Sequence, residues 1–369
     1  MLWNRIVMLG AVALPGLWAL PLKPMSSAEL CGRCHRSIVE AWKESSHAKA
    51  AESRLFQDAL EVAEKAMGSQ VRQNCLGCHS PIAAQTGDMA MERKVSWEGV
   101  TCDYCHSIRD VSMVSGNAKA KLEYTNVKTG PLKDAISSTH LTAYSAVHTS
   151  SMVCAPCHEY TNSQGFAVLT TFSEWQASRY AKEGKTCQSC HMYQVSGRVA
   201  EARLDREPEG KVNLHRMPGS RSVAQLNQTL KTRIISAREG GRIKVTVEVA
   251  NTGAGHSVPT GSPLRQLILQ VDAEGGGKKL SQNKVYTRKV ADASGAAMGA
   301  EHTAFLKAAK SISDTRLAPD EKRVEEFWFD IPSGSPANIR ANLSYFYSPS
   351  ERSAEQRTVT IRTLNDRVR

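Results

Sequence analysis

The sequence predicts an α+β protein in two parts. A mostly helical or irregular region over 29–220 is followed by an antiparallel β-sandwich of immunoglobulin-like kind over 221–369. Three observations carry this prediction. All ten cysteines lie at or before Cys190 in short repeated motifs, helical periodicity appears between those motifs, and alternating apolar segments begin after Arg221.

Residues 1–28 are expected to be a secretory signal or an N-terminal anchor. Arg5 precedes an apolar run over 6–20, which is shorter than the roughly twenty residues that a membrane-spanning helix needs. Ser26 and Ala28 fit the small-residue positions of a cleavage site, although they lie well past the apolar run. This pattern does not distinguish a periplasmic from an extracellular location. We expect export to the periplasm or the cell exterior, with an uncleaved membrane anchor as the open alternative.

Within 29–220 the periodicity predicts two helices. The first covers 45–67, where apolar residues recur near helical spacing, and the second covers 172–182. Elsewhere in this region Gly and Pro interrupt the pattern, and little alternation typical of strands is present.

The second part shows the sequence pattern of a β protein. Gly, Pro, Asn and Asp punctuate seven short alternating or β-branched segments, as in a sandwich. These expected strands are 232–236, 242–250, 266–271, 285–290, 324–329, 339–347 and 358–363. The longest interruption, 291–319, is expected to be a loop with a short helix around 303–310.

Five copies of Cys-x-x-Cys-His use every cysteine of the chain. This is the attachment signature of c-type haem, in which two thiols add across the vinyl groups of one porphyrin and the following His binds the iron. The expected thioether cysteines are Cys31, Cys34, Cys75, Cys78, Cys102, Cys105, Cys154, Cys157, Cys187 and Cys190, and the expected proximal ligands are His35, His79, His106, His158 and His191.

Zinc sites and disulfides are the competing interpretations of Cys-x-x-Cys. A zinc array pairs such units into fours, which requires an even number of units and no His at a constant offset. Five units with an invariant following His therefore favour five covalently bound haem c groups. Because that many porphyrins in fewer than two hundred residues leave little chain for a side-chain core, the porphyrins themselves are expected to form the core.

The remaining histidines are candidates for the second axial position of each iron. His is the natural sixth ligand of a low-potential haem, whereas Met raises the potential. The expected distal ligands are His47, His140, His148, His215 and His256. His140 and His148 are eight residues apart, so one helix could present both. His256 lies in a Gly-rich, Pro-containing turn between two strands, which is a rigid support for one side chain. His302 is expected to be a solvated residue.

The formal net charge of +11 would suit a polyanionic partner. However, each haem adds two propionates, so five ferric haems remove roughly five units of positive charge. Lys and Arg are also scattered, with no run of five. Nucleic acid is therefore not an expected partner.

These residues resemble the multihaem cytochromes c of the cytochrome c-554 and hydroxylamine-oxidoreductase-related group. The resemblance covers about 170 residues and rests on 31–35 with Trp42 and 46–47, on 99–106 and on 154–159. It extends to pentahaem members with an appended β-sandwich, for which 255–261 and 314–317 have look-alikes. The resemblance implies haems stacked in close pairs, with electron transfer as the common function. The chain departs from pentahaem nitrite reductases by lacking a Cys-x-x-Cys-Lys motif, and from the hydroxylamine enzymes by having five motifs rather than eight.

The expected function is electron transfer by an exported pentahaem cytochrome with mainly bis-His haems and no catalytic residues. Its expected partners are redox proteins, either membrane quinol-linked proteins or other cytochromes. Two alternatives stay open. One is a reductase or dehydrogenase of a small nitrogen or sulfur compound, which needs one open iron. The other is a homo-oligomer or extracellular filament, in which a residue such as His302 binds a neighbour's haem.

Overall fold

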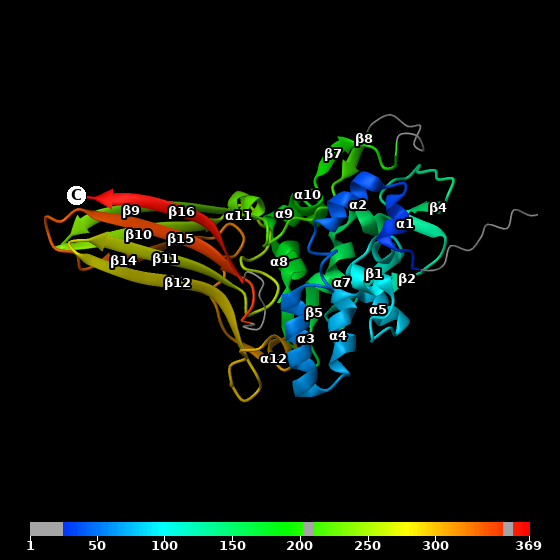
Figure 1. The fold of residues 1–369 in the computed structure, drawn as a ribbon, viewed down its shortest axis with the longest axis horizontal. Coiled ribbons are helices and arrows are strands. Elements are labelled where there is room, and N and C mark those ends of the chain that lie inside the picture. Colours follow the sequence, from blue (N-terminus) through cyan, green and yellow to red (C-terminus); the bar gives the residue numbers. More distant parts are fainter. Residues whose placement is uncertain (1–24, 202–209, 350–356) are drawn as a thin grey trace, which may run out of the picture.

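The computed structural model describes residues 25–201, 210–349 and 357–369. The molecule has two lobes, which follow one another along its long axis (Figure 1). Helices and short hairpins form one lobe, and long strands form the other. Most of the expected signal or anchor, residues 1–24, lies outside the described residues. Within the described ranges, no helix is both long enough and apolar enough to cross a membrane.

The helices are short and belong mostly to the first lobe. The α-helices are α1 (Ala28–Gly32), α2 (Arg36–Lys43), α3 (Arg54–Met67), α4 (Val71–His79), α5 (Pro81–Thr86), α6 (Cys102–Cys105), α7 (Ala155–His158), α8 (Thr171–Ala177), α9 (Arg179–Lys182), α10 (Cys187–His191), α11 (Val223–Thr229) and α12 (Glu301–Leu306). The 3-10 helices are η1 (Lys94–Glu98), η2 (Ala146–Thr149) and η3 (Ser151–Cys154).

The two helices predicted for this lobe are confirmed with changed bounds. Helix α3 begins at Arg54 rather than near residue 45, buries Leu55, Leu60 and Ala63 at helical spacing, and ends at Gly68, whose φ of 87° suits glycine. The expected helix over 172–182 is divided into α8 and α9, because Ser178 adopts an extended conformation between them.

Eight short strands in the first lobe were not predicted. They are β1 (Ile108–Val114), β2 (Asn117–Leu122), β3 (Val127–Gly130), β4 (Leu141–Tyr144), β5 (Glu159–Thr161), β6 (Ala167–Thr170), β7 (Gln194–Gly197) and β8 (Gly210–Asn213). They pair as β1-β2, β3-β4, β5-β6 and β7-β8, and only the β3-β4 pair is parallel. Each is too short or too exposed to show an apolar alternation in the sequence.

The second lobe consists of two antiparallel sheets. Its strands are β9 (Leu230–Glu239), β10 (Arg242–Asn251), β11 (Gln266–Gly275), β12 (Lys278–Ala291), β13 (Lys310–Asp314), β14 (Lys322–Phe329), β15 (Ala337–Phe346) and β16 (Thr358–Val368). The strand orders are β14-β10-β9 and β13-β12-β11-β15-β16. All seven predicted strands are present. Strand β13 was missed inside the expected loop because its residues are mostly exposed and polar.

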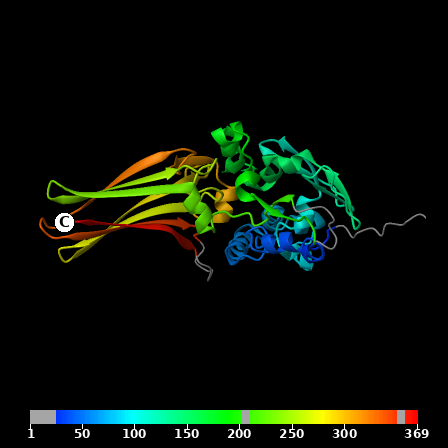
Figure 2. The ribbon, with the colours of Figure 1, turned by 90° about the horizontal axis from the view of Figure 1, so that it is seen from above.

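One apolar core joins these two sheets, which Figure 2 shows as separate layers. Alternate residues of β10, including Val245 and Val247, are completely buried, and Leu267 and Leu269 of β11 belong to the same cluster. Leu55 of α3 reaches this core from the first lobe. The first lobe itself has several smaller apolar clusters rather than one.

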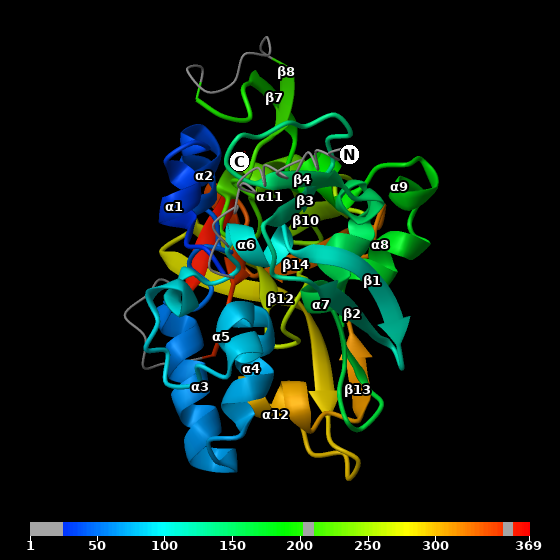
Figure 3. The ribbon, with the colours of Figure 1, turned by 90° about the vertical axis from the view of Figure 1, so that its right-hand side faces the viewer.

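The two lobes are joined by direct contacts as well as by the chain. Helix α12, which interrupts the second lobe between β12 and β13, packs beside α3 (Figure 3). Arg288 of β12 donates hydrogen bonds to the carbonyl oxygens of Ala167 and Val168 in β6, at 3.0 and 3.2 Å. The second lobe is therefore positioned to supply side chains to the first.

Candidate haem sites

Each Cys-x-x-Cys-His motif lies on a short helix or at its end. Helices α4, α6, α7 and α10 contain or border the second to fifth motifs, and the first motif begins in α1. Positions i, i+3 and i+4 of a helical turn share one face, so both sulfurs and the imidazole of a motif point to the same side. None of the ten cysteines forms a disulfide. This arrangement fits two thioether bonds and one iron ligand from each motif.

Backbone carbonyl groups fix the orientation of most of these imidazoles. The Nδ1 atoms of four proximal histidines lie 2.6–2.9 Å from carbonyl oxygens, and a carbonyl can only accept a hydrogen bond. Nδ1 therefore carries the proton, and Nε2 keeps the lone pair that a metal needs. The pairs are His35 with Val199, His79 with Ala50, His106 with Thr129, and His191 with Pro218.

Four of the five expected distal histidines also have a hydrogen-bond partner on Nδ1, and in three of them it is a carbonyl oxygen. Nδ1 of His140, His215 and His256 donates to the carbonyl oxygens of Leu141, Asn213 and Ser257, at 3.1, 2.8 and 3.0 Å. Nδ1 of His47 instead lies 2.8 Å from the Sδ atom of Met217. In all four residues Nε2 is left free for a metal.

Burial keeps several of these rings neutral. It lowers the pKa of His47 and of His215 to about 4, with neighbouring imidazoles as the second cause. A neutral imidazole is the form that binds iron. The buried environment therefore selects the ligating state at neutral pH.

Four proximal rings face a second histidine ring at a characteristic distance. With about 2 Å for each metal–nitrogen bond and about 1 Å from nitrogen to ring centre, two imidazoles on opposite sides of one iron have centres about 6 Å apart. The observed ring centres are separated by 6.2 Å for His35–His140, 6.1 Å for His47–His158, 6.4 Å for His106–His215 and 6.4 Å for His191–His256. Each separation leaves room for one iron.

His106 has a second histidine neighbour. The ring of His148 lies 5.7 Å from it, but Nε2 of His148 is 3.0 Å from the carbonyl oxygen of Cys105, and its Nδ1 is buried without a partner in the described part of the chain. Since one iron has a single position opposite His106, His148 and His215 cannot both occupy it. The prediction that one helix presents His140 and His148 is wrong, because His140 precedes β4 and His148 lies in η2.

His79 is different from the other proximal histidines. Its ring contact is with Phe56 of α3, which stacks on it with ring centres 3.9 Å apart and planes 5° from parallel. Across the described residues, which include every histidine of the chain, no histidine ring is paired with it. His302, the remaining histidine, is in α12 and is not in ring contact with any proximal histidine. Within the described residues, the second motif is therefore the one whose histidine ring contacts no other histidine ring.

The loop that carries His256 is clamped onto α8 of the first lobe. Glu174 of α8 accepts a hydrogen bond from the backbone N–H of Ser257 at 2.9 Å, and its other oxygen lies 2.7 Å from Nη2 of Arg316. Burial by itself raises the pKa of Glu174, but Arg316 and these hydrogen bonds outweigh it, and the net pKa is lowered. A Cβ atom on Gly255 would lie 3.0 Å from Cδ1 of Trp175, so this close approach requires glycine.

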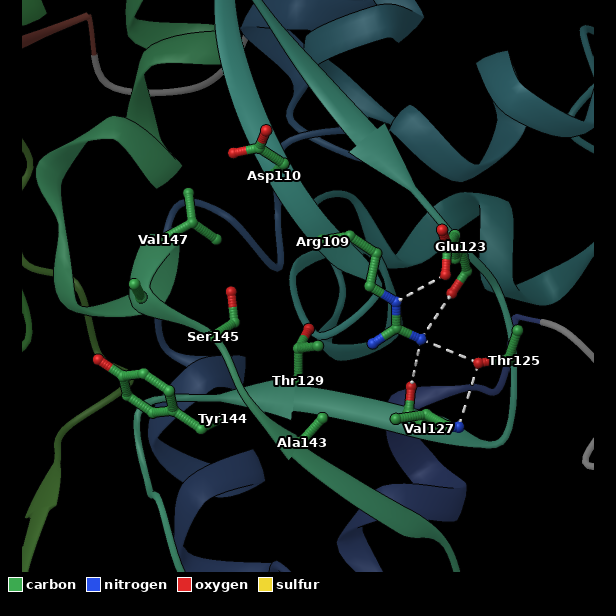
Figure 4. A pocket seen from close by; sticks show the side chains of 11 residues that line it. Arg109, Asp110, Glu123, Thr125, Val127, Thr129, Ala143, Tyr144, Ser145 and Val147 are labelled. Carbon is green, nitrogen blue, oxygen red and sulfur yellow. Dashed lines mark hydrogen bonds and ion pairs between the residues drawn. The ribbon is translucent and has the colours of Figure 1, made fainter.

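A cavity of about 650 Å³ is lined in part by Thr129, whose carbonyl oxygen is the backbone partner of His106 (Figure 4). Arg109 lies in this cavity, and its guanidinium donates hydrogen bonds to Glu123, Thr125 and the carbonyl oxygen of Val127. These bonds tie Nε and Nη2 of Arg109 to residues 123–127, which lead into β3, the strand whose Thr129 orients His106.

The residues that orient the imidazoles are not apparent from the sequence. Most are backbone carbonyls, for which any residue type would serve, so no sequence signal exists. Met217, Glu174 and Arg316 act through side chains. Two hints were present: Met217 precedes Pro218 and Gly219, two residues that restrict or release the backbone, and Arg316 lies in the motif 314–317.

Comparison with known proteins agrees with this geometry. The family model "Cytochrome c554 and c-prime" matches residues 30–107. Cytochrome c-554 of Nitrosomonas europaea is 32% identical over 89 residues, which are 22% of this chain and 38% of that protein. The crystal structure of a penta-heme cytochrome c552 from Thermochromatium tepidum superposes with a TM-score of 0.74 at 22% identity, covering 94% of this chain and 100% of that one.

The chain is a multihaem c-type cytochrome. The family match lies on the first three motifs, and the structural match extends the shared fold through both lobes. In a c-type cytochrome the haem is bound covalently and exchanges single electrons. The chain spans about 38% of the length of the curated cytochrome c-554, and the activity of that whole protein is not transferred to it.

Proposed function

We propose that this cytochrome is an exported pentahaem electron-transfer protein with four bis-His irons and one iron that has an open side. The observation that carries the proposal is the set of four proximal histidines, each facing a second imidazole at 6.1–6.4 Å. Bound haem supplies a one-electron ferric–ferrous couple, and two neutral imidazoles suit a low potential. The chain's part is to hold those imidazoles neutral and oriented.

The proposed ligand pairs follow from these distances. Each Cys-x-x-Cys-His motif would anchor one haem through its two cysteines, ten in all, and its own histidine. The pairs are His35 with His140, His106 with His215, His158 with His47, and His191 with His256. We favour His215 over His148 opposite His106, because Nε2 of His215 is free whereas Nε2 of His148 is engaged with Cys105.

Thiol contacts between motifs support an order for the haems. The side chain of Cys31 contacts that of Cys102, Cys78 contacts Cys157, and Cys154 contacts Cys187. These contacts bring the first motif to the third, the second to the fourth and the fourth to the fifth. Cys105 also interacts electrostatically with Cys154, which links the third motif to the fourth. We therefore propose that electrons branch at the fourth haem, with the first, second and fifth as ends.

The open side at the second motif favours a second candidate function. An iron bound by His79 alone can accept a small ligand, so a reductase or dehydrogenase of a small nitrogen or sulfur compound is possible at this one haem. Phe56 covers a face of the His79 ring, and it does not supply a ligand atom. Electron transfer remains the first candidate because the other four proximal histidines are paired.

The second lobe has a proposed role as well. We propose that 221–369 is an immunoglobulin-like sandwich appended to a haem-binding region over 29–220. The strand orders β14-β10-β9 and β12-β11-β15-β16 and the shared core support this division. The lobe would supply His256 and a docking face for a redox protein, such as a quinol-linked protein or another cytochrome. A periplasmic or extracellular location is part of the proposal.

Haem loading and spin state test the proposal together. Intact mass and a pyridine haemochrome assay of protein made in a strain competent for cytochrome maturation should give five haems per chain. Electron paramagnetic resonance of the oxidised protein should then show four low-spin irons and one high-spin iron. A colourless protein, or one with the mass of its amino acids alone, contradicts the whole proposal.

A further test separates the two candidate functions. Nitric oxide should change the high-spin signal alone if the second iron is accessible. Steady-state reduction of hydroxylamine or nitrite at a rate that His79→Ala abolishes would favour the enzyme. Ligand binding without turnover, combined with rapid electron exchange, would favour the electron carrier.

A further inference from the structure

One short segment of the first lobe contacts iron ligands of three motifs. The segment 213–218 connects β8 to the turn before α11 and forms no regular structure after Asn213. Its three contacts are His215 facing His106, Met217 Sδ beside Nδ1 of His47, and the carbonyl oxygen of Pro218 accepting from Nδ1 of His191. In the proposed pairing these histidines belong to the third, fourth and fifth haems.

The contact between Met217 and His47 differs from the others in its chemistry. A thioether sulfur is a weak acceptor and has no hydrogen to donate, whereas a carbonyl oxygen is a strong acceptor. Nδ1 of His47 therefore carries the proton and donates it to Met217 at 2.8 Å. The other distal imidazoles of the proposed pairs, those of His140, His215 and His256, donate to carbonyl oxygens.

His158, the proposed partner of His47, also lacks a strong hydrogen-bond acceptor. His158 faces His47 at 6.1 Å, and neither of its ring nitrogens has a hydrogen-bond partner in the described parts of the chain. The His47–His158 pair is therefore the one in which no imidazole donates to a carbonyl. A strong acceptor on Nδ1 makes the ligating nitrogen more basic and stabilises ferric iron, so its absence favours ferrous iron.

The backbone holds Met217 in a demanding conformation. Its φ is 44°, in the left-handed region that residues other than glycine adopt uncommonly. The side chain packs with the cluster of Ala28, Val39 and Trp42, next to the first motif. Such a conformation persists where surrounding contacts determine it, and it brings the sulfur rather than a carbonyl to His47.

We infer that Met217 is a positioning residue for His47 that keeps the potential of the His158 haem higher than a carbonyl or amide acceptor would. This inference rests on the proposed function, since it concerns an iron held between His47 and His158. The His158 haem is the fourth one, at which electrons branch in the proposed order. Its potential would therefore be set in part by the sulfur of Met217.

The test is the midpoint potential of that haem in the fully loaded protein. Met217→Gln replaces the thioether by an amide whose oxygen is a strong acceptor, and we expect a downward shift. A tenfold change in the ferrous to ferric ratio at a fixed potential, about 59 mV for one electron, is the expected size. Met217→Leu keeps an apolar side chain of similar volume and should shift the same haem slightly upward.

Controls assign and delimit the effect. His47→Gly, with its low-spin signal restored by free imidazole, identifies which spectroscopic component belongs to this haem. Met113→Gln, at an exposed position of β1, controls for adding an amide and should leave all five potentials unchanged. The low-spin signal of the His47 haem should move in the Met217 variants while the others stay in place.

Three results overturn the inference. They are an unmoved potential in both variants, a shift of the same sign in both, and an equal shift of every haem, which would indicate a general structural role. If Met217→Gln does not fold, the sign of the Met217→Leu shift still decides. Failure of the proposed function looks different: the protein would hold fewer haems or no His47-dependent low-spin signal, whatever the residue at 217.

Discussion

The two lobes bury apolar surface in different ways. In the second lobe one continuous cluster runs through both sheets, from Leu230 in β9 to Val368 in β16. In the first lobe the buried apolar residues form separate small clusters, and side chains leave His47 half-buried and His158 exposed. The comparison teaches that side chains alone specify the sheets, whereas the first lobe is complete only with its porphyrins.

Withholding haem is expected to have the largest effect on this comparison. Protein made without cytochrome maturation should lose protected structure in the first lobe and keep it in the sheets, because only the sheets have a continuous side-chain core. Hydrogen exchange measured by mass spectrometry on peptides of both lobes checks this. Equal protection of the two lobes without haem would show that the first lobe does not depend on its cofactor.

A core truncation in the sheets should give the reverse pattern. Leu269 is almost completely buried in β11, and Leu269→Ala should lower the free energy of unfolding of the second lobe by about 2–5 kcal/mol. Haem content should not change. Chemical denaturation followed by tryptophan fluorescence, together with the haem absorbance, measures both. Ile235→Ala, at an exposed site of β9, is the matched control and should cost less than about 0.5 kcal/mol.

The loop of His256 links the two lobes and can be broken without touching either core. Glu174→Gln removes the charge that pairs with Arg316 and weakens the bond to the backbone of Ser257. We expect part of the His191 iron to become high-spin, and we expect His256→Ala to convert it completely. Electron paramagnetic resonance measures the fraction. An unchanged low-spin signal in His256→Ala would remove His256 from the ligand set.

Acid should weaken the same link. Because the pKa of Glu174 is lowered in the folded protein, its contribution to stability is fully present above the unfolded value and is lost as the pH falls through the folded value. Arg316 stays charged throughout, since Glu174 and Asp314 raise its pKa. The high-spin fraction of the His191 iron should therefore rise with acidification in the natural protein. In Glu174→Gln that rise should be smaller, because the titrating group is gone.

The smallest expected effect concerns an exposed ion pair of α3. Lys65 and Glu61 are 2.6 Å apart on the helix surface, with about half or more of each side chain exposed. Lys65→Ala should lower the free energy of unfolding by about 0.3–0.5 kcal/mol or less, because water screens the pair. Thermal unfolding of the loaded protein measures this. A larger loss would mean that surface ion pairs contribute more to the free energy of unfolding of the first lobe than screening by water allows.

Sequence reasoning succeeded where local chemistry decides. The Cys-x-x-Cys-His motifs predicted the attachment signature that the family comparison supports, and the alternation in 242–250 predicted β10 almost residue by residue. The helix of 54–67 was also predicted, because its apolar face repeats at helical spacing. These features depend on residues close together in the chain.

Long-range pairing could not be predicted in the same way. Nothing near His215 in the sequence indicates that its ring faces that of His106, more than one hundred residues earlier. Likewise, nothing marks the carbonyl group of Thr129 as the hydrogen-bond partner of His106. Strands β3 and β4 were missed because their pairing is set by such contacts and not by an apolar alternation. The number of candidate histidines gave no sign that two histidine rings face that of His106, whereas no histidine ring contacts that of His79 in the described residues.

The placement of His256 has a mechanical consequence. If the fifth iron joins His191 to His256, a coordination bond closes a long loop of chain that passes from one lobe into the other. Such a bond reduces the conformational entropy of the unfolded chain much as a covalent crosslink does. The resulting stabilisation grows slowly with the length of the closed loop. Pulling the two lobes apart in a force experiment would then load an iron–nitrogen bond before any strand of the sheets is peeled away.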